Sequence, residues 1–177
     1  MSAIQIRPVV ASDVPHLMGI DHSASSENVW QLELRREAGQ IVATFRDVRL
    51  PRPIALTYPR DPFSLGDEWK NMAIIFAALS ESEAVGYVAL IEHPLAAAWV
   101  TDLVVSPAWR RRGVGSALLD SAREWADQRG HRRIFLEMQS KNQAAIRLAQ
   151  KHAYEFCGYN DHYYSTQDIA LFFARAV

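Results

Sequence analysis

The chain has one cysteine, Cys157, among its 177 residues. A single thiol supports neither an internal disulfide nor a cysteine-rich metal centre, and we expect Cys157 to be a small buried filler. No apolar run approaches the ~20 residues that a membrane-spanning helix needs, and no basic and apolar leader opens the chain. These absences predict a cytoplasmic protein with no membrane partner.

An excess of charge of one sign is also missing, since 19 Lys and Arg face 20 Asp and Glu. A nucleic-acid binder needs many phosphate contacts on a basic surface, which a formal net charge of −1 does not offer. The 6 histidines are scattered without the spacing of metal ligands. We therefore expect no nucleic-acid partner and no bound metal.

The chain does have enough apolar residues, 49% of the sequence, to fill one ordinary core, and we expect a single domain over residues 1–177. Apolar runs and alternation predict strands at 4–10, 73–79, 84–91, 97–105, 133–138, 154–159 and 168–176. Helical spacing predicts helices at 13–25, 113–129 and 142–152. Strands that come first and then alternate with helices predict an α/β (α+β) fold, a mixed sheet with helices on its faces.

Residues 30–70 are the least regular part of the sequence. Alternating apolar residues at 30–34 and 41–50 flank Glu37-Ala-Gly39-Gln and predict a hairpin. Four prolines, at positions 51, 53, 59 and 62, then predict an irregular connection with a short helix near 62–70.

The most unusual segment precedes the predicted helix at 113–129. Arg110, Arg111 and Arg112 crowd a helix start whose partial positive charge favours acidic residues. No Ser, Thr, Asp or Asn stands at the capping position, while Gly113 and Gly115 allow close approach to the backbone. An anion such as a phosphate bound at this helix start explains the arrangement, although the glycines also fit a plain tight turn.

Two common phosphate-binding motifs do not fit this segment. A P-loop needs a lysine after its second glycine, and a dinucleotide fingerprint needs a third glycine where Leu118 stands. A third pattern, Arg/Gln-x-x-Gly-x-Gly/Ala, fits residues 110–115. Related stretches surround it: Asp102-Leu-Val-Val105-Ser-Pro107, Leu136-Glu-Met, Asn142-x-x-Ala145-Ile-x-Leu148 and Lys151-x-Ala-Tyr154. Together they resemble the GNAT N-acetyltransferase superfamily over about residues 84–160, more weakly over 4–18 and not over 30–70.

The resemblance implies a mostly antiparallel sheet that splits into a V where strand 97–105 parts from strand 133–138. It also implies acetyl-CoA as co-substrate, with pantetheine along the first strand and pyrophosphate at the glycine segment. The residues expected to bind it are Leu103, Val104, Val105, Arg110, Arg111, Arg112, Gly113, Val114, Gly115, Ser116 and Asn142. Asn142 fits a plain helix cap equally well.

The implied reaction is direct attack of an amine on the thioester, which requires a base. The candidates are Asp102, Glu137 and Glu92. A buried charge such as Asp102 needs a partner or a purpose, so a structural ion pair is the alternative. The backbone N–H of Val105 is expected to stabilise the developing oxyanion.

The position where the family often carries a tyrosine as general acid is Ala149. Tyr154, Tyr163 or Tyr164 could replace it, and we take Tyr164 as the candidate, with core or rim packing as the alternative for each. The missing tyrosine also leaves open a non-catalytic module that binds or senses acyl-CoA.

Within the superfamily, the segments Glu124-Trp-Ala126 and Tyr164–Phe173 are similar to streptothricin-type antibiotic acetyltransferases. The stretch around the glycine segment is also similar to ribosomal-protein N-terminal acetyltransferases. The acceptor is thus expected to be a primary amine of a small molecule or peptide, with residues 30–70 on the acceptor side. The closing strands offer an edge for a homodimer, but no residue decides the oligomeric state.

Overall fold

A seven-stranded sheet in the order β1-β4-β5-β6-β7-β9-β8 forms the centre of the computed structural model, which describes residues 4–177. The strands are β1 (Gln5–Pro8), β4 (Ile74–Ser80), β5 (Glu83–His93), β6 (Ala97–Val105), β7 (Arg133–Gln139), β8 (Glu155–Asn160) and β9 (Ala170–Ala176). Every neighbouring pair is antiparallel except β6 and β7, which are parallel. The predicted mixed, mostly antiparallel sheet is confirmed.

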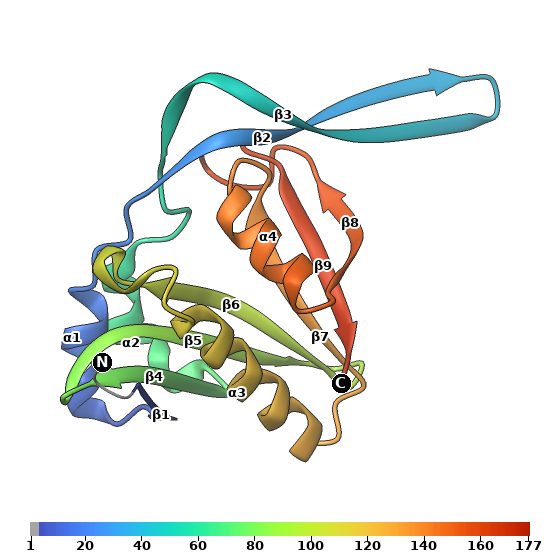
Figure 1. Ribbon diagram of the computed structural model, residues 1–177. Coiled ribbons are helices and arrows are strands. Elements are labelled where there is room, and N and C mark those ends of the chain that lie inside the picture. Colours follow the sequence, from blue (N-terminus) through green and yellow to red (C-terminus); the bar gives the residue numbers. More distant parts are fainter. Residues whose placement is uncertain (1–3) are drawn as a thin grey trace.

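Helices cover both faces of this sheet (Figure 1). On one face, α3 (Val114–Gln128) and α4 (Gln143–Lys151) bury Leu118 and Ile146 in the larger core cluster. On the other, α1 (Val14–Met18) and α2 (Leu65–Glu68) bury Leu17 and Leu65 in a second cluster. Short 3₁₀ turns complete the helical elements: η1 (Ala11–Asp13), η2 (Pro62–Ser64), η3 (Trp69–Asn71) and η4 (Pro107–Trp109).

The sheet splits between β6 and β7. The two strands pair from Ala97 with Arg133 to Val100 with Leu136, and no register is shared beyond that within the described chain. Both strands nevertheless continue, β6 to Val105 and β7 to Gln139, and their ribbons diverge (Figure 1). We call these unpaired ends, residues 101–105 and 137–139, the split. The predicted V is confirmed.

A separate two-stranded hairpin, β2 (Ala24–Glu37) with β3 (Gln40–Leu56), projects beyond the sheet like an arm (Figure 1). Its turn contains Gly39 at φ +83°, a left-handed conformation that suits glycine. The arm is longer than the predicted hairpin because β3 continues through Pro51 and Pro53. In a two-stranded ribbon the outer side of each strand has no partner strand, so a missing N–H is tolerated there.

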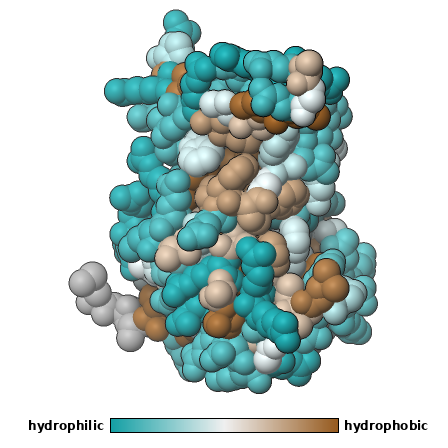
Figure 2. Space-filling view, turned by 90° about the vertical axis from the view of Figure 1, so that its right-hand side faces the viewer, coloured by the Kyte–Doolittle hydropathy of each residue, from teal (hydrophilic) through white to brown (hydrophobic). Residues whose placement is uncertain are grey.

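The outer part of the arm exposes apolar side chains, among them Leu34, Val42 and Ile41, the last at 70%. Figure 2 views this end of the molecule and shows an apolar patch at the top and an apolar band across the middle. Single exposed apolar residues are common on protein surfaces, whereas large contiguous apolar patches are rare.

Two expectations are wrong. The helix predicted for residues 13–25 ends at Met18, because the Ile20 N–H turns back to the Leu17 carbonyl at 3.2 Å and the chain is extended from Ala24. Cys157 is exposed rather than buried. It lies at a register shift in β8, the last strand of the sheet, where its thiol donates to the Phe172 carbonyl at 3.4 Å.

Candidate active site

One extra residue in β6 decides where Asp102 points. Ala89 of β5 is opposite Asp102 and Leu90 is opposite Val100, so Thr101 is a bulge. Before the bulge Val100 packs in the α3–α4 cluster, whereas after it Val104 packs in the α1–α2 cluster. Because side chains alternate along a strand, Asp102 shares the face of Val104 and faces α1 and α2.

Glu137 of β7 lies on the same face of the sheet. Its neighbours Leu136 and Met138 pack in the opposite, α3–α4 cluster. The side chains of Asp102 and Glu137 are 9% and 5% exposed, so the split carries two buried carboxylates, one on each strand. Buried carboxylates require partners.

Arg60 joins these two carboxylates across the split. Its guanidinium donates to Asp102 Oδ1 at 3.1 Å and to Glu137 Oε1 at 3.2 Å, and it also donates to the carbonyl of the bulged Thr101. Burial lowers the pKa of Arg60, but the two carboxylates outweigh this and raise its pKa overall. The structural ion pair considered for Asp102 is therefore present. We call Arg60, Asp102 and Glu137 the Arg60 cluster; its one cation and two carboxylates leave one net negative formal charge.

Tyrosine hydroxyls surround the same carboxylates. Tyr163 Oη donates to Glu137 Oε2 at 3.1 Å, and Tyr164, 8% exposed, stacks edge-on against Tyr163. Burial and then the Glu137 charge raise the pKa of Tyr164, so its hydroxyl stays protonated at neutral pH. Tyr58 Oη donates to Asp102 Oδ1, on the β6 strand of the split.

The arm begins and ends beside the split. Just before β2, the Ser23 carbonyl accepts from Arg110 Nη2 at 2.6 Å. Just after β3, the Thr57 carbonyl accepts from Gln139 Nε2 at 3.2 Å. Further along, the Trp30 N–H donates to the Ser140 carbonyl at 2.9 Å. The arm thus connects both halves of the split sheet.

The glycine segment leaves the start of α3 open to an anion. Gly113 has φ +87°, no side chain caps the helix, and the first intrahelical bond in this turn joins the Ala117 N–H to the Gly113 carbonyl. The backbone N–H groups of Val114, Gly115 and Ser116 precede that bond and point out of the helix end. A Cβ on Gly113 would meet nothing within 4 Å, so the space beside it is free.

The three arginines do not behave alike. Arg110 Nε donates to the Val105 carbonyl at 2.9 Å, so this side chain braces the loop against β6. Arg112 lies 5.2 Å above the Trp109 ring. Arg111 adopts φ +62°, which helps turn the loop into the helix. At Gly115, an added Cβ would lie 3.2 Å from the side chain of Leu148, so close helix packing also favours glycine here.

Backbone groups of β6 face the split at alternate residues. The Ser106 N–H donates to the Val85 carbonyl of β5 at 2.9 Å. By alternation Val104 directs its backbone to β5, and Leu103 and Val105 direct theirs to the side from which β7 has departed. The backbone groups of Leu103 and the N–H of Val105 therefore face a ligand in the split, whereas those of Val104 do not. The Val105 carbonyl already accepts from Arg110.

The remaining candidates have local roles. Asn142 caps α4, its Oδ1 accepting from the Ala145 N–H at 3.1 Å. Ala149 is fully buried in the core, and Tyr154 is 3% exposed with its pKa raised to about 12 by burial. Glu92 forms an exposed ion pair with Arg129 at 3.0 Å, and no contact joins it to the Arg60 cluster among the described residues.

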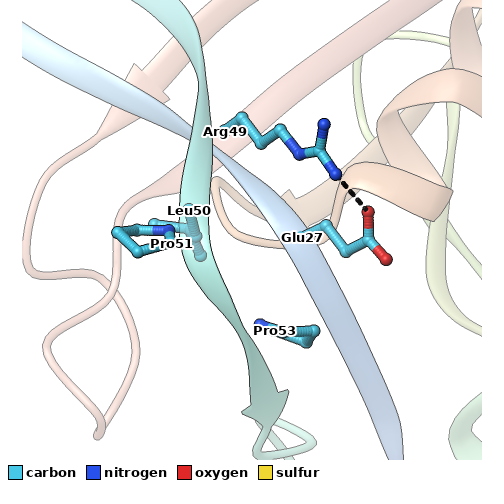
Figure 3. A pocket seen from close by; sticks show the side chains of 5 residues that line it. All are labelled: Glu27, Arg49, Leu50, Pro51 and Pro53. Atoms are coloured by element: carbon cyan, nitrogen blue, oxygen red, sulfur yellow. Dashed lines mark ion pairs between the residues drawn. The ribbon is translucent and has the colours of Figure 1, made fainter.

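One concavity lies away from this cluster. It has a volume of about 440 Å³ and is lined by Glu27, Arg49, Leu50, Pro51 and Pro53 (Figure 3). It forms where β3 has four residues, 50–53, opposite Glu27 alone, and the Glu27–Arg49 ion pair is stretched to 4.0 Å. The concavity lies at an irregular part of the arm and shares no residue with the Arg60 cluster.

Within residues 4–177, no three His, Cys, Asp or Glu side chains gather as a metal site would require. No helix in that range is both long enough and apolar enough to cross a membrane.

Comparison with known proteins places this geometry in a family. A model described as the acetyltransferase (GNAT) family matches residues 41–154. Streptothricin acetyltransferase of Streptomyces lavendulae is 23% identical over 167 residues, which cover 89% of this chain and 84% of that protein. The ribosomal protein bS18-alanine N-acetyltransferase of Escherichia coli K12 is 30% identical over 95 residues, 51% of this chain and 61% of that protein.

Solved structures share the fold over nearly all of the chain. The crystal structure of nourseothricin acetyltransferase superposes with a TM-score of 0.82 at 24% identity and covers 99% of both chains. A structure described as a streptothricin acetyltransferase from Bacillus anthracis, in complex with acetyl coenzyme A, superposes with a TM-score of 0.78 at 23% identity. It covers 99% of this chain and 100% of that one.

Tyr58 and Arg60 were missed at the sequence level. Both lie in a stretch with no shared motif, in Thr57-Tyr-Pro-Arg60, where prolines predicted only an irregular connection. A charged residue and an aromatic beside a proline are common in exposed loops, so no sequence signal marked them. Only the fold brings them to Asp102.

Proposed function

Because this chain belongs to the acetyltransferase (GNAT) family, we propose that it transfers an acetyl group from acetyl-CoA to a primary amine of a small molecule. The observation that carries this proposal is the pair of buried carboxylates, Asp102 and Glu137, that share one guanidinium across the split. A cluster with one net negative charge favours a cationic amine over a neutral or anionic acceptor.

The open start of α3 fits the diphosphate of acetyl-CoA. Free N–H groups at Val114, Gly115 and Ser116 and the helix dipole favour an anion at this position. The edge at Leu103 and Val105 suits the amides of pantetheine, which bind like an added strand. When bound, acetyl-CoA supplies an acetyl group activated as a thioester. The acetyl-CoA complex of a structural relative supports the assignment.

Asp102 is proposed as the base. An amine has a pKa near ~10 and is mostly protonated at neutral pH, so it must lose a proton before it attacks. Asp102 lies on β6 next to Leu103 and Val105, so a carboxylate and the proposed oxyanion donor, the Val105 N–H, belong to the same strand. Glu137, on the opposite strand, holds the acceptor's positive charge.

Tyr164 is proposed as the acid in place of the tyrosine that Ala149 replaces. It stays protonated at neutral pH and lies beside Glu137, at the split. Its contribution is expected to be modest, because a thiolate with a pKa of ~8.5 leaves without strong assistance.

We propose that residues 1–177 act as one domain in which residues 30–70 flank the acceptor. Tyr58 and Arg60 support this assignment, since both come from that segment and bind Asp102. Differences in the arm and in this connection then set acceptor specificity.

Release of free thiol from acetyl-CoA, measured with streptothricin and with a peptide bearing the N-terminal sequence of bS18, tests the function. Turnover that depends on streptothricin supports the proposal, and preference for the peptide assigns N-terminal acetylation instead. Tight acetyl-CoA binding without turnover on either acceptor or on a panel of other amines identifies a non-catalytic binding module.

A further inference from the structure

A row of hydrogen-bonding side chains runs from Asp102 to the molecular surface. It consists of Tyr58, Tyr87 and His22, none of which belongs to the glycine motif. Counted as whole residues, Asp102 and Tyr87 are 8% and 2% exposed, whereas His22 is only half-buried. The row therefore leads outward from the proposed base.

The contacts along this row fix most proton positions. Tyr58 Oη donates to Asp102 Oδ1. His22 Nδ1 lies 2.6 Å from the Ile20 carbonyl, which can only accept, so Nδ1 carries the ring proton. In the neutral ring Nε2 is then an acceptor, and it lies 3.1 Å from Tyr87 Oη. Tyr87 thus donates to His22.

Tyr58 and Tyr87 meet in the middle of the row. Their rings flank the His22 ring, with centroids 4.6 Å and 6.0 Å from it. Burial raises the pKa of Tyr87, and the nearby Tyr58 hydroxyl opposes this rise. Both tyrosines and Asp102 line one cavity of only about 10 Å³, about the size of one water probe.

We propose that Tyr58, Tyr87 and His22 form a relay that carries the proton removed by Asp102 to solvent. This proposal rests on the acetyltransferase function proposed above. Asp102 takes one proton from the acceptor ammonium. Once Asp102 is protonated, the Tyr58 hydroxyl turns from Asp102 to Tyr87. Asp102 then gives its proton to Tyr58 Oη while Tyr58 passes its own to Tyr87 and Tyr87 passes its own to His22 Nε2. The imidazolium then releases one proton to water, and no net charge stays buried.

The groups around His22 favour this direction of transfer. The side chains that face it are Tyr58, Tyr87, Asp102, Asp21 and Arg110. Burial, the largest influence, lowers the pKa of His22, so the ring is neutral at neutral pH and its Nε2 is free to accept. An imidazolium formed there loses its proton readily. On its other side, Asp102 contacts Arg60, which has donors only and cannot accept a proton.

The test uses His22→Gln, which keeps a hydrogen-bonding side chain but cannot carry a proton. His16→Gln is the matched control, since His16 is exposed on α1. Thiol release with streptothricin is measured at neutral pH in dilute buffer, with and without added imidazole. We expect kcat of His22→Gln to fall about tenfold and imidazole to restore it, with KM for acetyl-CoA unchanged.

In Tyr87→Phe, kcat is expected to fall by a similar factor. Imidazole should not restore it, because the missing hydroxyl lies inside the protein, where imidazole in solution cannot take its place. A His22→Gln variant as fast as wild type, or slow but not rescued by imidazole, overturns the relay. Absence of wild-type turnover on streptothricin and on the amine panel overturns the proposed function itself, and with it the relay.

Discussion

Arg60 Nη2 lies 3.2 Å from Glu137 Oε1, and through this contact a side chain that follows the arm is bonded to β7. The same guanidinium bonds to Asp102 on β6, so one side chain joins two strands whose backbones have parted. A split sheet loses backbone hydrogen bonds at its opening, and Arg60 replaces part of that connection while leaving room between the strands.

Replacing Arg60 by methionine should therefore destabilise the protein. The change leaves two carboxylates buried without their cation, which costs about 2 kcal/mol after allowance for the partial exposure of Arg60. The free energy of unfolding from urea titration measures it. When Asp102→Asn and Glu137→Gln are both already present, the loss of stability caused by Arg60→Met should be smaller. A single variant as stable as wild type would show that the contact contributes nothing.

Gly115→Asp should weaken acetyl-CoA binding by an order of magnitude or more. The added carboxylate repels phosphate at a helix start, and its Cβ would press on Leu148. Gly39→Asp at the tip of the arm is the control, because it adds the same charge with nothing within 4 Å, and aspartate tolerates the left-handed conformation there better than most residues. Isothermal titration of acetyl-CoA into each folded variant compares them. Equal acetyl-CoA affinities of the Gly115→Asp and Gly39→Asp variants would show that the phosphates do not bind at the start of α3.

Asp102→Asn should lower kcat/KM more at neutral pH than at alkaline pH. At high pH the acceptor amine is deprotonated by solvent and a base is needed less. Glu92→Gln serves as the control, since Glu92 lies in an exposed ion pair. A pH profile of thiol release distinguishes the two roles of Asp102: a loss that is uniform across pH indicates a structural ion pair only.

His22 should make stability depend on pH. Its pKa in the folded protein is below the ordinary value near ~6.5, so the unfolded chain binds a proton more readily as the pH falls through that range. Stability should decrease with falling pH until the folded-state pKa is passed and then level off. Melting temperatures between about pH 7.5 and about pH 5.5 should fall less in His22→Gln than in wild type. Parallel curves would contradict the lowered pKa.

The spacing of apolar residues was sufficient to predict elements with a long apolar face, such as α3 and β6, because burial of that face outweighs other influences on local structure. It did not reveal features that a single residue decides. Thr101 adds a bulge that turns Asp102 toward α1 and α2, and nothing in the local pattern marks it. Gly19 and Ile20 end α1 early although helical spacing continues past them.

The acceptor side was harder to predict than the glycine motif for a physical reason. Phosphate binding uses backbone groups of contiguous residues, and these leave a spacing in the sequence. The carboxylate cluster unites Tyr58, Arg60, Asp102, Glu137 and Tyr163 from distant segments, and only side-chain geometry connects them. Asp102, Glu137 and Tyr163 were found as candidates, but Tyr58 and Arg60 were not.

The measurement that tests the central claim most directly is the mass of streptothricin after incubation with acetyl-CoA and the protein. We predict a product heavier by one acetyl group, formed in proportion to protein and lost in Gly115→Asp. Unchanged streptothricin and unchanged amines across a panel, with acetyl-CoA bound but not consumed, would contradict the assignment of this protein as a small-molecule N-acetyltransferase.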